Sequence, residues 1–127
     1  MKRIALIAFG AAALAMGTSA YAQTMEEGFP AGSLAVAAIE RGDWATAERL
    51  LEEDRGLARD NPARLVNLGR VYMATGRTGQ ALAVWRDAMA DRHPEEIVTA
   101  GGRVTTTDRL AREAIAHYEQ ALASAAR

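Results

Sequence analysis

The sequence predicts an all-α fold, a short solenoid of helical hairpins that follows a cleavable signal peptide. Three observations lead to this prediction. Apolar residues recur every three or four positions in several segments, as they do along one face of a helix. Glycine and proline separate these segments at places suited to helix ends. The order of small and aromatic residues also repeats along the chain, which is typical of stacked hairpins.

Residues 1–22 are expected to be an export signal. Lys2 and Arg3 give a basic start, an uncharged apolar run follows, and positions 20–22 read Ala-Tyr-Ala, a cleavage pattern of small residues before Gln23. The apolar run is shorter than the roughly 20 residues of a membrane span, although an uncleaved anchor is the competing interpretation. We therefore expect a bacterial protein exported through the inner membrane to the periplasm.

The amino-acid composition excludes several kinds of functional site. The 127 residues include no cysteine, which excludes disulfides, a thiol nucleophile and cysteine-bound zinc. The formal net charge is −1, with 15 basic and 16 acidic side chains. A chain with this balance has no electrostatic reason to seek phosphate backbones, so a nucleic-acid partner is not expected.

The first helical hairpin is expected at residues 33–58, after a flexible leader at 23–32. Ser33 is an N-cap candidate, because its hydroxyl can accept a bond from a free N–H of the first turn. Gly42 marks the end of the first helix, and a second helix starts near Trp44.

The second hairpin is expected at residues 62–91. Asn61 can cap a helix whose first residue is Pro62, since the missing N–H of proline is one that the first turn leaves unpaired. Gly76 follows the last turn, where a left-handed residue is needed. Thr78 is the cap candidate for the second helix of this hairpin.

The segment 94–105 breaks the helical pattern. Paired glycines at 101–102 and a run of β-branched residues oppose a helix. Two alternatives remain: irregular structure with a single degenerate turn, or a small β-hairpin with strands at 97–99 and 103–105. Irregular structure with a possible hairpin is slightly preferred.

A closing helix is expected at 106–124, so that the helical domain as a whole covers 33–125. Thr105 or Thr107 can cap the closing helix. Its polar residues suit the last unit of a stack, which must meet water on one face.

The second hairpin carries a series of small and aromatic residues at fixed spacing: Leu68, Gly69, Tyr72, Ala81, Trp85 and Ala88. With this series it resembles the tetratricopeptide repeat, a helix-turn-helix unit of about 34 residues. Small residues allow the two helices to approach closely and aromatic residues fill the space beside them. Four aromatic residues at repeat positions are expected in the core: Trp44, Tyr72, Trp85 and Tyr118.

The resemblance implies about two and a half repeats and a scaffold that binds proteins. In this family the first helices of the repeats line a concave groove for a peptide or a partner helix. Arg70 would then give the groove polarity, although a solvated role is the alternative. Some members clamp a carboxylate; only Asn67 matches that pattern, and Lys2 is the only lysine. Carried over by position, the groove residues are Val36, Ile39, Glu40, Ala63, Val66, Arg70, Met73 and Ala74.

No pattern of catalytic, metal or cofactor residues stands out. The two histidines, His93 and His117, lie far apart in sequence and have no acidic pair at ligand spacing. The prediction is therefore a non-enzymatic interaction module without a cofactor. The alternatives are a self-associating structural protein, such as a homodimer, and an accessory subunit of an envelope complex.

Overall fold

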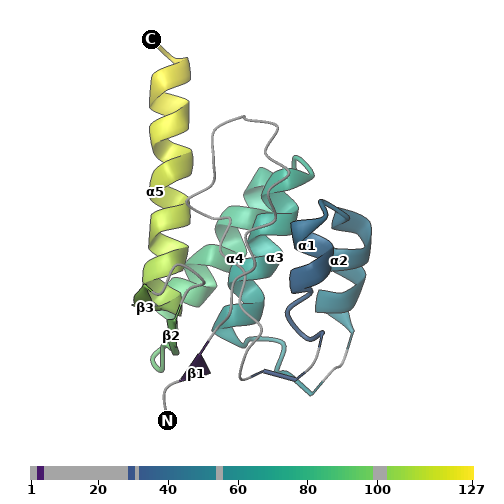
Figure 1. The fold of residues 1–127 in the computed structure, drawn as a ribbon. Coiled ribbons are helices and arrows are strands. Elements are labelled where there is room, and N and C mark those ends of the chain that lie inside the picture. The colour runs from purple at the N-terminus through teal and green to yellow at the C-terminus, as the bar shows by residue number, and fades with distance from the viewer. Residues whose placement is uncertain (1–2, 5–28, 31, 54–55, 99–102) are drawn as a thin grey trace.

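The computed structural model describes residues 3–4, 29–30, 32–53, 56–98 and 103–127. Most of the predicted signal segment and of the leader lies outside these residues. The described part is mostly helical and carries a small sheet (Figure 1). Its elements are β1 (Arg3–Ile4), α1 (Val36–Glu40), α2 (Trp44–Glu52), α3 (Pro62–Ala74), α4 (Thr78–Ala90), β2 (Glu96–Val98), β3 (Val104–Thr106) and α5 (Thr107–Ala125).

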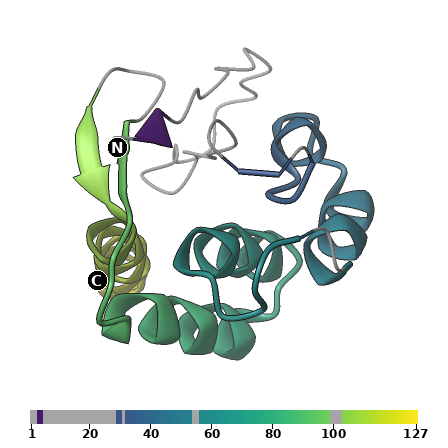
Figure 2. The same ribbon diagram turned by 90° about the horizontal axis from the view of Figure 1, so that it is seen from below.

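The helices form an arc of hairpins. Helices α1 and α2 make one hairpin, α3 and α4 make the next, and α5 packs mainly against α4 and also touches α3. Seen along the helices, α1, α3 and α5 lie toward the inside of the arc, whereas α2 and α4 lie toward its outside (Figure 2). The inner helices therefore share one side of the molecule.

Helix α3 begins and ends at the predicted residues. The side chain of Asn61 accepts hydrogen bonds from the N–H groups of Ala63 and Arg64, at 3.0 and 3.2 Å. At the other end Gly76 has a φ of +79°, and the N–H of Arg77 donates to the carbonyl of Tyr72 at 2.8 Å. This is a Schellman motif, in which a left-handed residue closes the last turn. Both predictions are confirmed.

Two other predicted caps are wrong. Helix α1 is capped by Ala35 in a left-handed conformation, and the N–H of Ser33 instead bonds to the carbonyl of Pro30 at 3.0 Å. Helix α4 has Arg77 at its N-cap, without a side-chain bond, so Thr78 is already helical. The Schellman motif explains the shift, because it fixes the backbone through Arg77 and the next helix starts directly behind it.

The core is centred on the contact between α3 and α4. Trp85 is fully buried, and its indole N–H donates to the carbonyl of Val66 at 3.0 Å. Gly69 lies beneath the indole ring, as the close-approach argument predicts. Tyr72 is also buried, whereas Trp44 and Tyr118 are half-buried. Of the four aromatic residues expected in the core, Tyr72 and Trp85 are buried there, and Trp44 and Tyr118 are only partly buried.

Residues 94–105 contain strands, so the hairpin that the preferred interpretation left possible is present and the single degenerate turn is wrong. Strands β2 and β3 pair antiparallel, with Ile97 opposite Thr105. Each strand starts one residue away from its predicted position, and β1 adds a parallel neighbour to β2. The fold is therefore mostly helical rather than purely α-helical.

The closing helix α5 starts with Thr106 at its N-cap, not with Thr105 or Thr107. Thr105 is buried in β3, and Thr107 is the first helical residue. The hydroxyl of Thr107 accepts a bond from the N–H of Glu95 at 3.1 Å, and its own N–H donates to the carbonyl of Glu95 at 3.0 Å. Both candidate threonines therefore serve the sheet, which is why neither caps the helix.

Candidate functional site

The eight predicted groove residues lie on α1 and α3, and most of them are less exposed than a binding surface requires. We call this set the α1–α3 face. Three members, Glu40, Arg70 and Met73, are half-buried, and only Ala74 is exposed. The other four belong to the hydrophobic core: Val36, Ile39, Ala63 and Val66. The α1–α3 face is thus a row of core side chains with a partly accessible polar end.

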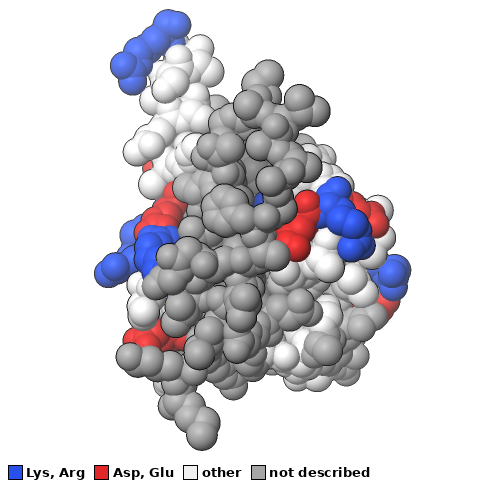
Figure 3. All heavy atoms as spheres, viewed as in Figure 1, with Lys and Arg blue, Asp and Glu red and all other residues white. Residues whose placement is uncertain are grey.

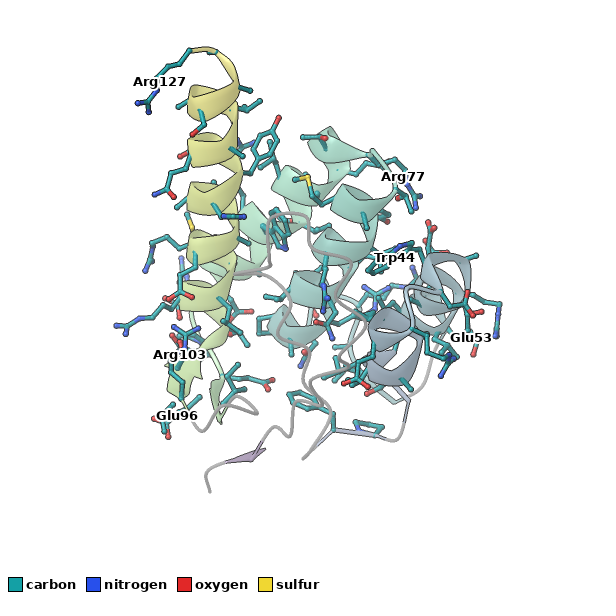
Figure 4. All side chains as sticks on the ribbon, turned by 45° about the horizontal axis from the view of Figure 1, so that its top comes forward. Trp44, Glu53, Arg77, Glu96, Arg103 and Arg127 are labelled. Carbon is teal, nitrogen blue, oxygen red and sulfur yellow. The ribbon has the colours of Figure 1, made fainter. Side chains whose placement is uncertain are left out.

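Arg70 is the cation of the α1–α3 face. Its guanidinium carbon lies 6.0 Å from the ring centroid of Trp44. Trp44 is the first residue of α2 (Figure 4). Burial lowers the pKa of Arg70 to about 10, and the nearby Glu40 carboxylate opposes that decrease. Arg70 therefore stays charged at neutral pH in a place that is neither solvated nor fully closed.

Several polar atoms of the inner helices are buried without a hydrogen-bond partner in the described part of the chain. They come from the end of α1, from the turn before it and from the middle of α3. Buried polar groups are almost always paired, because an unpaired group loses its bonds to water. Within this set only Glu40 and Arg70 are half-buried rather than buried residues, so a ligand that brings a donor and an acceptor would satisfy these two. The atoms are Ser33 Oγ, Glu40 Oε1, Asn67 Oδ1 and Arg70 Nη1.

Asn67 is a structural residue that also contributes to this set. Its side chain is fully buried, and its amide Nδ2 donates to the carbonyl of Leu34 at 2.9 Å. This bond joins α3 to the turn before α1, so Asn67 is not on a surface where it could clamp a carboxylate. In sequence, the only sign of this role is that Asn67 lies one helical turn from Ala63 on the apolar side of α3.

A contact that sequence reasoning missed joins the two hairpins. The guanidinium of Arg77 donates to both carboxylate oxygens of Glu48, each at 2.6 Å. The same group lies 4.7 Å from the ring centroid of Tyr72. The bond to Arg77 lowers the pKa of Glu48. Because α2 and the turn after α3 are held together, the first hairpin is held against the second through α2.

Charged side chains of both signs lie side by side on both flanks of the view in Figure 3. Within the described ranges, no three His, Cys, Asp or Glu residues come together in a way that could hold a metal ion. His93 is exposed and His117 is half-buried. No described helix has the length and apolar character needed to cross a membrane.

Residues 38–98 match a family described as Tetratricopeptide repeat. The matched range begins within α1, contains α2, α3 and α4, and ends with β2. No match was found among curated proteins or among solved structures.

Proposed function

Because residues 38–98 match the tetratricopeptide-repeat family, we propose that the chain is a periplasmic interaction module that binds a peptide or a partner helix against the α1–α3 face. Such repeats generally mediate protein–protein interaction and are typically non-enzymatic. Protein binding is therefore the general function that we propose. The α1–α3 face as its site and the periplasm as its location are more specific proposals.

We choose the α1–α3 face as the binding surface because two opposite charges lie at its polar end. Glu40 Oε1 and Arg70 Nη1 are both buried and lack hydrogen-bond partners among the described residues. A polypeptide supplies N–H donors and carbonyl acceptors together, so one bound segment can pair with both groups. The half-buried side chain of Met73 adds a flexible apolar contact beside them.

Ala74 offers the best test of the α1–α3 face, because Ala74 is the one residue of this face that is exposed. Ala74→Arg adds bulk and charge at the last turn of α3, where a cation is compatible with the helix dipole. Ala83→Arg makes the same change at an exposed position of α4, on the outside of the arc. The pair therefore separates an effect on the face from a general effect of adding arginine.

The experiment is a crosslinking capture from envelope extract with the full chain and these two variants as baits. We expect a partner that is captured by the unsubstituted chain and by Ala83→Arg, and lost with Ala74→Arg. The same proteins on all three baits would contradict the choice of face. Capture of only the bait's own copies would favour a self-associating structural protein, and a partner at equal amounts through purification would favour an accessory subunit.

The proposed location is tested separately, by osmotic-shock fractionation and mass spectrometry of the intact protein. We expect the protein in the shock fluid, with an N-terminus at Gln23. Recovery in the membrane fraction with residues 1–22 still attached would instead favour the uncleaved anchor.

A further inference from the structure

We propose that the outer edge of β2 is a docking site for an extended segment of a partner protein, which adds a strand parallel to β2 and carries a basic residue followed by an apolar one. The site goes beyond the α1–α3 face because it uses backbone groups of the sheet. It would give the module a second contact with an extended partner segment.

The hydrogen-bond pattern of the hairpin identifies the backbone groups that point to this edge. The N–H of Thr107 donates to the carbonyl of Glu95 at 3.0 Å, so Glu95 faces β3. Backbone groups alternate in direction along a strand, so Ile97 also faces β3. The N–H and C=O groups of Glu96 and Val98 therefore point to the opposite edge, where an added strand can bond to them.

The structure itself has a strand at this edge. Strand β1 runs parallel to β2, with Arg3 opposite Ile97 and Ile4 opposite Val98. Both residues of β1 belong to the segment 1–22, whose removal the sequence predicts. Without β1, the edge would be left with unpaired N–H and C=O groups, which bind extended segments by strand addition.

The character of the partner segment follows from β1 and from β2. Strand β1 offers a basic and then an apolar residue, Arg3 and Ile4. In the register of β1, the basic residue of a docked strand lies opposite Ile97 and the apolar residue opposite Val98. Glu96, one residue before Ile97, is exposed and points away from the helices (Figure 4).

Strand β2 is held firmly from its other side. Ile97 is fully buried, and Glu95 is tied to Thr107 through its N–H and to Asn61 through a 2.9 Å side-chain bond. A docking strand therefore meets an edge that is already in position, which lowers the entropic cost of binding.

The test measures binding of a fluorescent peptide with the sequence of residues 1–6 to the full chain by anisotropy. Arg3→Pro removes an N–H of β1, so it weakens the strand that competes within the same molecule. We expect the Arg3→Pro chain to bind the peptide about tenfold more tightly than the unsubstituted chain. Absence of binding to the Arg3→Pro chain would overturn the proposal.

A matched pair of second substitutions in the Arg3→Pro chain locates the site. Val98→Pro removes an N–H that points to the edge and leaves the bonds to β3 in place, whereas Val98→Thr keeps that N–H. We expect Val98→Pro to weaken peptide binding about fivefold to tenfold, since each hydrogen bond contributes roughly 1 kcal/mol, and Val98→Thr to leave it unchanged. Equal binding by the two would overturn the proposal.

Hydrogen exchange provides a measurement that does not depend on how Val98→Pro folds. In the Arg3→Pro chain, the peptide should slow exchange of the Glu96 and Val98 amides and leave the Ile97 amide unchanged. Uniform protection or none would contradict strand addition. Ala74→Arg should not affect peptide binding, so loss of the α1–α3 face and loss of the β2 edge are distinguishable.

Discussion

At the crossing of α3 and α4, residue 69 has room for a hydrogen atom and nothing larger. A Cβ at Gly69 would lie 2.6 Å from Cε2 of Trp85, inside the indole ring. Gly69→Ala must therefore move the ring or separate the helices, and either change strains the bond from Trp85 to Val66. We expect a loss of about 1–3 kcal/mol in the free energy of unfolding, as for other overpacked cores, measured by urea denaturation.

Gly79→Ala is the control for that substitution. Gly79 lies in the first turn of α4, and a Cβ there would meet no atom within 4 Å. Alanine is the better helix former, so stability should stay unchanged or rise by up to about 0.5 kcal/mol. A similar loss in both variants would show that the effect of Gly69→Ala is not steric.

At this scale, the sequence predicts those residues whose role depends only on their neighbours in the chain. Asn61 and Gly76 are examples, because a side-chain cap and a left-handed turn are local features. Ser33 was assigned by the same rule, but the preceding turn bonds its N–H to Pro30 and its hydroxyl is buried instead. The burial of Arg70 beside Trp44 was equally hidden, since the two residues come from different hairpins.

At the scale of the elements, one buried hydroxyl contributes to the contact between the hairpin β2–β3 and α5. Thr107 is fully buried, and its Oγ1 accepts the N–H of Glu95 at 3.1 Å. Thr107→Val keeps the shape but leaves that donor unpaired, at a cost of about 1–3 kcal/mol. Thr107→Ser keeps the hydroxyl and should lose less. Thermal unfolding of the two variants makes the comparison, and a larger loss with serine would contradict a role for the hydrogen bond.

The link between the first and second hairpins should depend on pH. Because Arg77 lowers the pKa of Glu48 below its ordinary value of 4.5, the ionised carboxylate stabilises the fold above that value. This stabilisation is lost as the pH falls through the lowered pKa of the folded state. Glu48→Gln should therefore melt at a lower temperature than the unsubstituted chain at pH 7, and the two should converge below pH 4.5. We expect a smaller loss than for Gly69→Ala, since partly exposed ion pairs contribute little.

A difference between Glu48→Gln and the unsubstituted chain that persists at low pH would mean that the charge of Glu48 is not what joins the hairpins. Added salt provides a second check, because screening should reduce the difference at pH 7.

Among the elements, helices could be predicted better than strands. The apolar period and the local turn residues lead to α2, α3 and α4 within a few positions. The β2–β3 hairpin stayed one of two alternatives because its pairing is fixed by contacts across sequence, such as Glu95 with Thr107. The glycine pair and the β-branched run do not determine which residues of β2 and β3 lie opposite each other.

On the scale of the whole molecule, the sequence predicts that the residues of the α1–α3 face lie on helices inside the arc. It does not predict how deeply their side chains are buried. Position within a repeat assigns a residue to a helix face, whereas burial depends on how neighbouring hairpins pack. Val36, Ile39, Ala63 and Val66 therefore lie in the core, and Glu40 and Arg70 form the polar end. Whether a partner binds there remains a prediction.

The exposed apolar side chains of the described residues allow a prediction about self-association. Its exposed large apolar side chains are Met89, Val104 and Leu122, at 36%, 52% and 52% exposure, and they come from α4, β3 and α5. Single apolar residues on separate elements are ordinary on a monomer, whereas a stable interface needs a contiguous patch. We expect light scattering to give the mass of one chain, 13.6 kDa for the full sequence, at every concentration. A mass that rises toward twice this value would favour the homodimer, and its loss with Leu122→Glu would place the interface on α5.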